Sequence, residues 1–472
     1  MTLRVLLISG IVSCLFACSA QQHSTAPKTQ LSDPKSQSSF YSNLEGMSEQ
    51  KLQTSHWLQS PTQNKRVILS TEELLKITEQ QFAQQRYLKS PLSYPDTLSG
   101  QKITSLIEKA STPSKYPRFY PDGTPLTEKE YQPYIDEMAL DSVNSQQKVQ
   151  FAVVVKRAPM RKFPTLDRVL NSGMDYDIDR FQETGAFPGE NLAVLHVSRS
   201  GEWMFVQNYH YRAWIQSKYV ALTSRQTLEQ FSKKQHDDFL MVTGDKVFTT
   251  FDPYDKSISE VQLDMGVKLP HISHQEFEKF ELNRHNPYTG YIVQLPTRTD
   301  DGRLQLKPAL IARSADVAFE YLPYTEENII TQAFKFLGER YGWGHDFNGR
   351  DCTGFVGEIY KTFGLLMPRN SSQQGVAEYG QNQTFEKGTA VSEKLPYYNQ
   401  LKVGDLLYLP GHVAMFLGYS NGQPYIIHDV HGLGYENSQG EKVSGILNGV
   451  SITPLLPFKS YLKSIYNIKS IR

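Results

Sequence analysis

The stretch "GRDCTGFVGEIYKTFG", residues 349–364, holds a cysteine in what is predicted to be the first turn of a helix. Apolar residues follow it at helical spacing: Val356, Ile359, Tyr360 and Phe363. One side of this helix should therefore face a core. Because a helix N-terminus stabilises a thiolate, the sequence predicts a reactive Cys352 with a lowered pKa.

Cysteine usage indicates that Cys352 is unpaired. Arg4 precedes an apolar run over residues 5–17 that is too short to span a bilayer, which predicts a secretory signal over residues 1–18. The run ends in "LFAC", which resembles the lipobox of bacterial lipoproteins. Cleavage there would remove Cys14 and leave Cys18 as a lipidated first residue. No cysteine then remains to form a disulfide with Cys352.

These features predict a periplasmic lipoprotein anchored to a membrane through Cys18. Ser19 follows, where an aspartate would suggest inner-membrane retention in enterobacteria, so the outer membrane is favoured. Residues 19–60 are rich in Gln, Ser, Thr and Pro without apolar periodicity, which predicts a flexible tether. The 472 residues carry 49 basic and 49 acidic side chains, and nothing favours a nucleic-acid partner. We expect a monomer.

Residues 61–148 are predicted to form a helical N-terminal region. Ser70 and Glu73 have the spacing of a capping box, and Leu74 begins an apolar helix face. Because no cluster of titratable residues occurs here, a packing role is expected.

Residues 149–223 change to the period-two pattern of short strands, with Ser200 and Gly201 as a hairpin turn. The segment ends in "YRAWIQSKYVAL", where Trp214 is expected to be exposed before a closing strand. It resembles the bacterial SH3-like domains of cell-wall proteins. Residues 238–324 are also rich in strands and are predicted to form a second, diverged SH3-like barrel.

The C-terminal residues 325–472 are predicted to carry the chemistry. Thr325 is a suitable N-cap for a helix that ends at Gly338. His412 and His428 lie on consecutive predicted strands, where one imidazole can accept the thiol proton while the other orients it. His431 competes with His428 for the third place in this Cys-His-His order.

Residues 325–460 resemble the NlpC-type cysteine peptidases of bacterial cell walls, which carry aspartate-cysteine-serine-glycine, then a histidine strand, then a third polar residue. The resemblance implies a papain-like α+β catalytic domain and a Cys352, His412 and His428 site. In "YGWGH", Tyr341 would assist the Cys352 amide N–H in binding the oxyanion.

The same resemblance places the free amino group of the substrate near Asp351, Thr353 and, in "PRNSSQQ", Ser371. Two residues depart from the family pattern. His345 stands where glycine is usual, which could change the loop before Cys352. Thr353 stands where serine is usual, and its extra methyl group could change how the substrate fits.

The order of helical region, two SH3-like barrels and peptidase is similar to the multi-domain lipoprotein branch of this family. That similarity implies cleavage between γ-D-glutamate and a diamino acid, meso-diaminopimelate or L-lysine, in peptidoglycan stem peptides with free N-terminal L-alanine. The first barrel would wall off the site, with Tyr176 and Tyr209 as candidate contacts to the amine. No cofactor is expected, and the remaining histidines lack metal-ligand spacing.

Two other classes of function stay open. The SH3-like barrels could bind peptidoglycan while the catalytic domain is degenerate. An acyltransferase or amidase on the same scaffold would share the thioester step and pass the acyl group to an amine.

Overall fold

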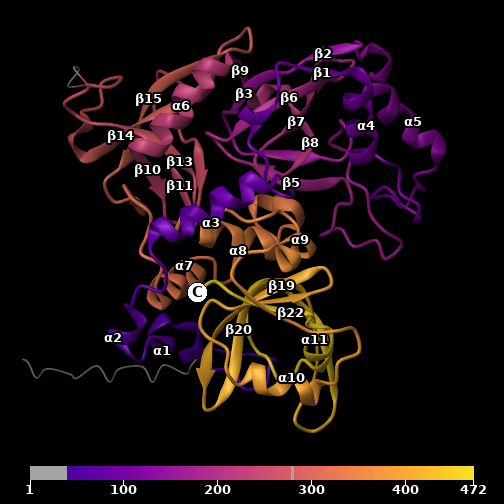
Figure 1. Cartoon of the computed structure of the whole chain (residues 1–472), viewed down its shortest axis with the longest axis vertical. Coiled ribbons are helices and arrows are strands. Elements are labelled where there is room, and N and C mark those ends of the chain that lie inside the picture. The colour runs from indigo at the N-terminus through magenta and orange to yellow at the C-terminus, as the bar shows by residue number, and fades with distance from the viewer. Residues whose placement is uncertain (1–39, 278–280) are drawn as a thin grey trace, which may run out of the picture. The chain divides into compact units, whose positions relative to one another are not determined.

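The computed structural model describes residues 40–277 and 281–472 (Figure 1). The predicted signal segment, the lipid-bearing Cys18 and most of the predicted tether lie outside the described residues. Within the described part, no helix is both long and apolar enough to cross a lipid bilayer. Residues Ser42–Arg472 form one compact unit that mixes helices with antiparallel sheets, which confirms the predicted α+β class.

Short helices dominate the described residues up to 148. They are η1 (Glu49–Leu52), α1 (Thr54–Trp57), α2 (Pro61–Asn64), α3 (Thr71–Gln84), η2 (Pro91–Ser93), α4 (Gly100–Ala110), α5 (Glu128–Glu137) and η3 (Leu140–Ser142), with a strand pair β1 (Thr97–Ser99) and β2 (Gln146–Lys148). The predicted capping box is confirmed at α3. Ser70 Oγ accepts the Glu73 amide N–H over 3.2 Å, and the Glu73 carboxylate accepts the Ser70 amide N–H over 2.8 Å.

The residues just before α2 pack against the C-terminal part of the unit. Trp57 is buried in the same core as Tyr425, whose hydroxyl donates to the Gly46 carbonyl over 2.8 Å. The composition predicts a flexible tether as far as residue 60, but the chain already belongs to the compact unit from residue 42 onward. The reason is that apolar anchors such as Trp57 and Leu44 lie within otherwise polar sequence.

A seven-stranded antiparallel sheet follows. Its strands are β3 (Gln150–Val154), β4 (Ala158–Arg161), β5 (Gln182–Ala186), β6 (Asn191–Val197), β7 (Trp203–Gln207), β8 (Arg212–Gln216) and β9 (Val220–Thr223), in the order β5-β4-β8-β7-β6-β3-β9. The predicted hairpin turn joins β6 to β7, where Gly201 has φ +76°. The described strands leave β5 and β9 as edges, so the sheet is not the closed barrel that was expected.

Both faces of this sheet are buried. Val154 and Val206 belong to the core on one face, and Phe205 and Trp214 to the core on the other, which α4 and α5 cover. Trp214 is fully buried, and its Nε1–H donates to Ser111 Oγ over 3.0 Å. The prediction of an exposed Trp214 is therefore wrong, because the helical region supplies a cover that the strand pattern does not reveal.

Helix α6 (Arg225–Asp237) leads to a second group of strands. They are β10 (Phe239–Val242), β11 (Lys246–Phe248), β12 (Gln262–Asp264), β13 (Lys268–Ile272), β14 (Gly290–Arg298), β15 (Leu304–Ala312) and β16 (Val317–Ala318), with η5 (Pro287–Thr289) before β14. Five of them form an open sheet in the order β15-β14-β13-β10-β16, and β11 pairs with β12 as a separate hairpin. Here too, the described strands do not close into a ring.

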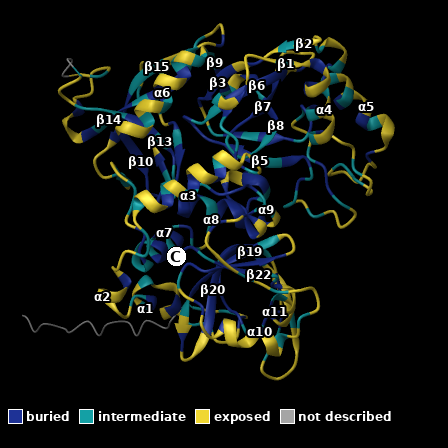
Figure 2. Ribbon diagram, viewed as in Figure 1, coloured by how far each residue is buried: buried dark blue, intermediate teal, exposed yellow. Residues whose placement is uncertain are grey.

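The C-terminal part packs helices on a six-stranded sheet. Its helices are α7 (Glu326–Phe334), η6 (Trp343–Asn348), α8 (Cys352–Lys361), α9 (Ser371–Val376), α10 (Val391–Tyr398) and α11 (Lys459–Ser464). Its strands are β17 (Gln381–Thr384), β18 (Leu406–Leu409), β19 (His412–Ser420), β20 (Gln423–Glu436), β21 (Lys442–Pro454) and β22 (Asn467–Ser470), in the order β17-β22-β18-β19-β20-β21. Figure 2 shows α8 and the adjoining strands β19 and β20 as largely buried. Thr325 caps α7 as predicted.

Candidate active site

Cys352 is the first residue of α8, and Asp351 caps this helix. Asp351 Oδ1 accepts the Gly354 amide N–H and the Thr353 hydroxyl, each over 2.9 Å. A Cβ at Gly354 would lie 2.7 Å from His345 Nε2, so the glycine permits close packing of the preceding loop. The predicted helix start at Cys352 is confirmed.

The Cys352 thiol is buried, and this changes its expected chemistry. Burial and the Asp351 carboxylate raise the pKa of the Cys352 thiol to about 12, although the Val413 amide N–H donates a hydrogen bond to it. The prediction of a lowered pKa is wrong for the protein without substrate. Loss of hydration outweighs the favourable helix N-terminus.

The two predicted histidines lie side by side on β19 and β20. His412 Nε2 is 3.0 Å from His428 Nδ1, and His428 Nε2 is 3.1 Å from the Thr453 hydroxyl oxygen. Burial lowers the pKa of His412 to about 4 and that of His428 well below its usual value, so both imidazoles are neutral at pH 7. The ring of Tyr461 packs against both.

This chain of contacts can hold His412 in a base-competent tautomer. If His428 Nε2–H donates to Thr453, then His428 Nδ1 must accept the Nε2–H of His412. His412 Nδ1 is then left unprotonated. The Val413 amide N–H donates to the Cys352 sulfur. The start of β19, which includes His412, therefore lies beside the thiol.

His431, the other candidate for the orienting position, lies elsewhere. Its Nε2 is 3.4 Å from Asp177 and 3.6 Å from Asp175. These three side chains could hold a metal ion, a grouping that histidine spacing alone does not predict. Asp177, however, already pairs with Arg340 and accepts the Asn448 side-chain amide over 2.9 Å.

Tyr341 and Cys352 line the same cavity. Burial and the proximity of Cys352 raise the pKa of the Tyr341 hydroxyl far above its usual value, so it remains a hydrogen-bond donor. The Tyr341 amide N–H donates to the Asn448 carbonyl over 3.0 Å, which ties its loop to β21. The amide N–H of Cys352, at the first position of α8, has no partner within the helix.

Arg369, which sequence reasoning did not single out, holds Asp351. Its guanidinium contacts Asp351 Oδ2 over 2.6 Å, Thr353 Oγ1 over 2.5 Å and Thr184 Oγ1 over 2.6 Å. Burial alone would raise the pKa of Asp351, but Arg369 and His345 outweigh it and hold that pKa well below its usual range. Asp351 is therefore a paired carboxylate.

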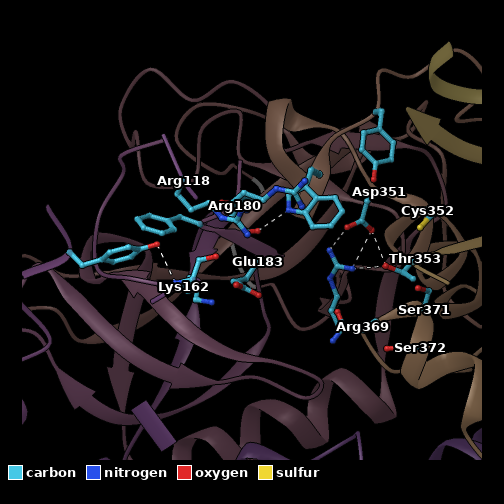
Figure 3. Close-up of a pocket in the computed structure, with 18 residues that line it drawn as sticks. Arg118, Lys162, Arg180, Glu183, Asp351, Cys352, Thr353, Arg369, Ser371 and Ser372 are labelled. Atoms are coloured by element: carbon cyan, nitrogen blue, oxygen red, sulfur yellow. Dashed lines mark hydrogen bonds and ion pairs between the residues drawn. The ribbon is translucent and has the colours of Figure 1, made fainter. Parts of the chain in front are cut away.

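The cavity around Cys352 has a volume of about 440 Å³, within the range usual for ligand sites. Its walls come from three parts of the chain: the helical region, the seven-stranded sheet and the C-terminal part. Ser371 and Thr353 lie beside Cys352, as the resemblance implies (Figure 3). The cavity is therefore completed by residues that are remote from the C-terminal motif.

Glu183 on β5 is a second site residue that the sequence analysis missed. It lines the cavity, its carboxylate accepts the Tyr211 hydroxyl, and burial raises its pKa. The two tyrosines proposed from sequence do not line this cavity. Tyr176 is 55% exposed beneath Arg168, and Tyr209 packs on His210 with ring centroids 3.9 Å apart.

His345 links β5 to α8. Its Nδ1 accepts the Gly185 amide N–H over 3.2 Å, and its Nε2 lies 3.2 Å from Glu358 Oε1. His345 has φ +66°, a conformation that glycine adopts more easily than other residues. This backbone conformation agrees with the family pattern, in which glycine is usual at this position. Burial lowers the pKa of His345 to about 4.

Asp429, next to His428, is fully buried. Neither carboxylate oxygen has a hydrogen-bond partner among the described residues. Burial, reinforced by Asp351 and Glu339, raises the pKa of Asp429 well above its usual value. Burial thus favours the protonated form of Asp429, which the strand pattern of the sequence does not predict.

Comparisons with known proteins agree with this arrangement. Residues 338–450 match the model of the NlpC/P60 family, and residues 164–216 match that of the SH3 domain of SH3b1 type. A solved NlpC/P60 endopeptidase from Photobacterium damselae subsp. piscicida superposes with a TM-score of 0.70 over 89% of this chain and 96% of that chain. The two are 16% identical in sequence, so this likeness concerns the fold.

Two curated relatives are similar in sequence. The γ-D-glutamyl-L-lysine dipeptidyl-peptidase of Bacillus cereus is 25% identical over 263 residues, which is 51% of this chain and 66% of that protein. Dipeptidyl-peptidase 6 of Lysinibacillus sphaericus is 25% identical over 220 residues, which is 46% of this chain and 70% of that protein. The match thus spans just under two thirds of the first relative.

Proposed function

The chain combines an NlpC/P60 peptidase domain with an SH3b-type domain, and from this premise we propose that it hydrolyses the bond between γ-D-glutamate and the diamino acid of peptidoglycan stem peptides. The observation that carries the proposal is one cavity shared by Cys352, Tyr341 and Glu183. The Bacillus cereus relative is a γ-D-glutamyl-L-lysine dipeptidyl-peptidase, and this similarity supports the choice of bond.

The reaction begins with a neutral thiol and a neutral imidazole. His412 Nδ1 takes the Cys352 proton as the sulfur attacks the γ-glutamyl carbonyl carbon. The Cys352 amide N–H and the Tyr341 hydroxyl stabilise the resulting oxyanion. His428 and Thr453 keep the imidazole of His412 aligned throughout.

Two proton transfers complete the cycle. The imidazolium of His412 protonates the leaving amine of the diamino acid, and the carbon–nitrogen bond breaks to leave a thioester. His412 then removes a proton from water, which attacks the thioester carbonyl. The peptide acid leaves, and the Cys352 sulfur regains its proton.

The amine end of the substrate is assigned to Glu183. Asp351 is already paired with Arg369, whereas Glu183 is bonded to the neutral hydroxyl of Tyr211. A substrate ammonium would therefore find its counter-charge at Glu183, assisted by Thr353 and Ser371. This wall should exclude peptides whose N-terminus is acylated.

The test uses the chain from Ser19 onward, which retains the compact unit Ser42–Arg472. It is incubated with L-Ala-γ-D-Glu-meso-diaminopimelate, its L-lysine counterpart and the N-acetylated form of each, and products are identified by mass spectrometry. We expect release of the free diamino acid from the unacetylated peptides alone. Glu183→Gln should narrow the preference for a free amine, and Cys352→Ala should abolish turnover.

Other outcomes point elsewhere. Turnover that survives Cys352→Ala would refute the assignment of the nucleophile. A product joined to an added acceptor amine would indicate acyl transfer, and binding without cleavage would indicate a degenerate catalytic domain. Equal cleavage of free and acetylated peptides would remove the role given to Glu183.

A further inference from the structure

More cationic side chains line the Cys352 cavity than its ion pairs with carboxylates neutralise. Four cationic side chains and two carboxylates line it, and Arg369 is paired with Asp351. Three cations remain, against Glu183 as the other carboxylate. The cavity wall therefore holds an excess of positive charge.

The three remaining cations are Arg118, Lys162 and Arg180. Among residues 40–277 and 281–472, none of them forms an ion pair with a carboxylate. Each is only partly exposed, which makes their convergence costly without an anion. Arg118 comes from the helical region, and Lys162 and Arg180 lie in the connection between β4 and β5, so folding brings the three together.

Arg180 gives an independent indication of a missing partner. Its Nε is buried and has no hydrogen-bond acceptor in the described part of the chain. Its guanidinium carbon lies 5.6 Å from the centre of the Trp343 ring, which also lines the cavity. Burial and the neighbouring Arg118 lower the pKa of Arg180, and the opposing effects of Asp175 and Tyr341 do not compensate.

We infer that Arg118, Lys162 and Arg180 form a subsite for a carboxylate of the stem peptide. This inference rests on the proposed function and extends it to specificity. Figure 3 shows the three cations at the end of the cavity away from Cys352, with Glu183 between. The acyl part L-Ala-γ-D-Glu has a single free carboxylate, the α-carboxylate of D-glutamate, so this group is the ligand assigned to the subsite.

The consequence is selection by charge. A stem peptide with free D-glutamate presents an anion to the subsite, whereas one with D-isoglutamine presents a neutral amide. An arginine-carboxylate contact has two charged hydrogen-bonding partners, and its loss weakens binding by about 10- to 100-fold. The enzyme should prefer the unamidated peptide by a similar factor.

The experiment compares L-Ala-γ-D-Glu-meso-diaminopimelate with the matching D-isoglutamine peptide. KM and kcat are measured for wild type, Arg180→Gln, Lys162→Gln and Arg118→Gln, and for the conservative Arg180→Lys. Lys233→Gln, an exposed position on α6, removes the same charge outside the cavity and is the control. Thermal unfolding of each variant checks that it folds.

We expect Arg180→Gln to raise KM for the acid peptide by about 10- to 100-fold and to leave KM for the amide peptide nearly unchanged. Arg180→Lys should recover part of the loss, and raised salt should weaken binding of the acid peptide more than that of the amide. Equal effects on both peptides, or no preference in the wild type, would overturn the inference.

A second pair of substrates identifies the source of the carboxylate. Peptides ending in meso-diaminopimelate, its side-chain amide and L-lysine differ in carboxylates on the leaving side. If the effect of Arg180→Gln on KM depends on these leaving-side carboxylates instead, the three cations still form a carboxylate subsite. Its ligand is then a carboxylate of the diamino acid. Sensitivity to neither carboxylate contradicts the proposal.

Binding measurements test the carboxylate subsite independently of the proposed hydrolysis. The dissociation constants of the acid and amide peptides are measured by calorimetry with Cys352→Ala, with and without Arg180→Gln. A charge preference that Arg180→Gln removes supports the subsite even if wild type fails to cleave either peptide. Cleavage without any such preference supports the function and refutes the subsite.

Discussion

Cys352 experiences two opposing influences on its thiol. The N-terminus of α8 favours the thiolate, while burial and the Asp351 carboxylate favour the neutral thiol, and the second influence dominates. His412 is also held neutral. In the protein without substrate the two groups are therefore a neutral thiol and a neutral imidazole.

This neutral pair predicts slow alkylation. Because the pKa of Cys352 is raised to about 12, iodoacetamide should modify it slowly near pH 7, with a rate that rises steadily to pH 10 and beyond. The rate is followed by mass spectrometry of the intact chain, with a small free thiol as reference. A pH-independent plateau of fast modification between pH 6 and pH 8 would instead indicate a stable thiolate and imidazolium pair.

The sequence predicted the candidate reacting groups of the proposed reaction, but it missed the side chains that surround them. Cys352, His412 and His428 follow from helix and strand spacing, because each position is set locally. Glu183 and Arg369 carry no such spacing, since their roles arise from contacts with segments far away in the chain. The thiol pKa was mispredicted for the same reason.

Strand β5 and the loop before α8 are joined by direct contacts. Gln182 Nε2 donates to the Gly344 carbonyl over 2.7 Å, and the Trp343 indole N–H donates to the Gln182 carbonyl over 3.1 Å. His345 adds a third contact by accepting the Gly185 amide N–H. These bonds fix the strand that carries Glu183 relative to the helix that carries Cys352.

His345 should make stability depend on pH. Its pKa is about 4 in the folded protein against 6.5 ordinarily, so the unfolded chain binds more protons between these values. Stability from this residue is present above pH 6.5 and is lost as pH falls toward 4. Between pH 7 and pH 5 the loss is about 2 kcal/mol.

The substitution His345→Gln should flatten this dependence by about the same amount, roughly 2 kcal/mol between pH 7 and pH 5, because glutamine does not titrate. The free energy of unfolding is measured with urea at both pH values. His412 and His428 contribute in the same direction and remain in the variant. His236→Gln, on the exposed side of α6, is the matched control, and an equal flattening in it would contradict the prediction.

Across the whole molecule, Arg350 connects the C-terminal part to the second group of strands. This fully buried guanidinium contacts Glu358 over 2.6 Å, Glu339 over 2.5 Å and Asp264 over 3.4 Å. It also donates to the Asp245 carbonyl over 2.9 Å. Three carboxylates from separate segments thus share this cation, and two of them have a second one: Asp264 also pairs with Arg157, and Glu339 with Lys246.

Removal of that cation should destabilise the whole unit. Arg350→Met leaves the buried Glu358 without the cation that contacts it over 2.6 Å, whereas Asp264 keeps Arg157 at 3.2 Å. We expect a loss of about 3 to 5 kcal/mol in the free energy of unfolding, mainly from Glu358. Urea denaturation followed by circular dichroism measures it. Arg199→Met, which breaks an exposed pair with Asp141, is the control and should change little. A similar small effect of Arg350→Met would mean that the network is not a structural link.

Local sequence patterns were enough to predict several helix starts and turns. Capping at Ser70 and Thr325, the turn at Gly201 and the helix start at Cys352 depend on neighbouring residues, so local pattern suffices. Three properties became evident only from the tertiary structure: the helical region covers Trp214, the described strands do not close into barrels, and the Cys352 thiol is neutral. The tertiary structure also decided that Glu183 and three unpaired cations share the cavity with Cys352. Those properties depend on which surfaces meet and exclude water, and that is settled only when distant segments pack together.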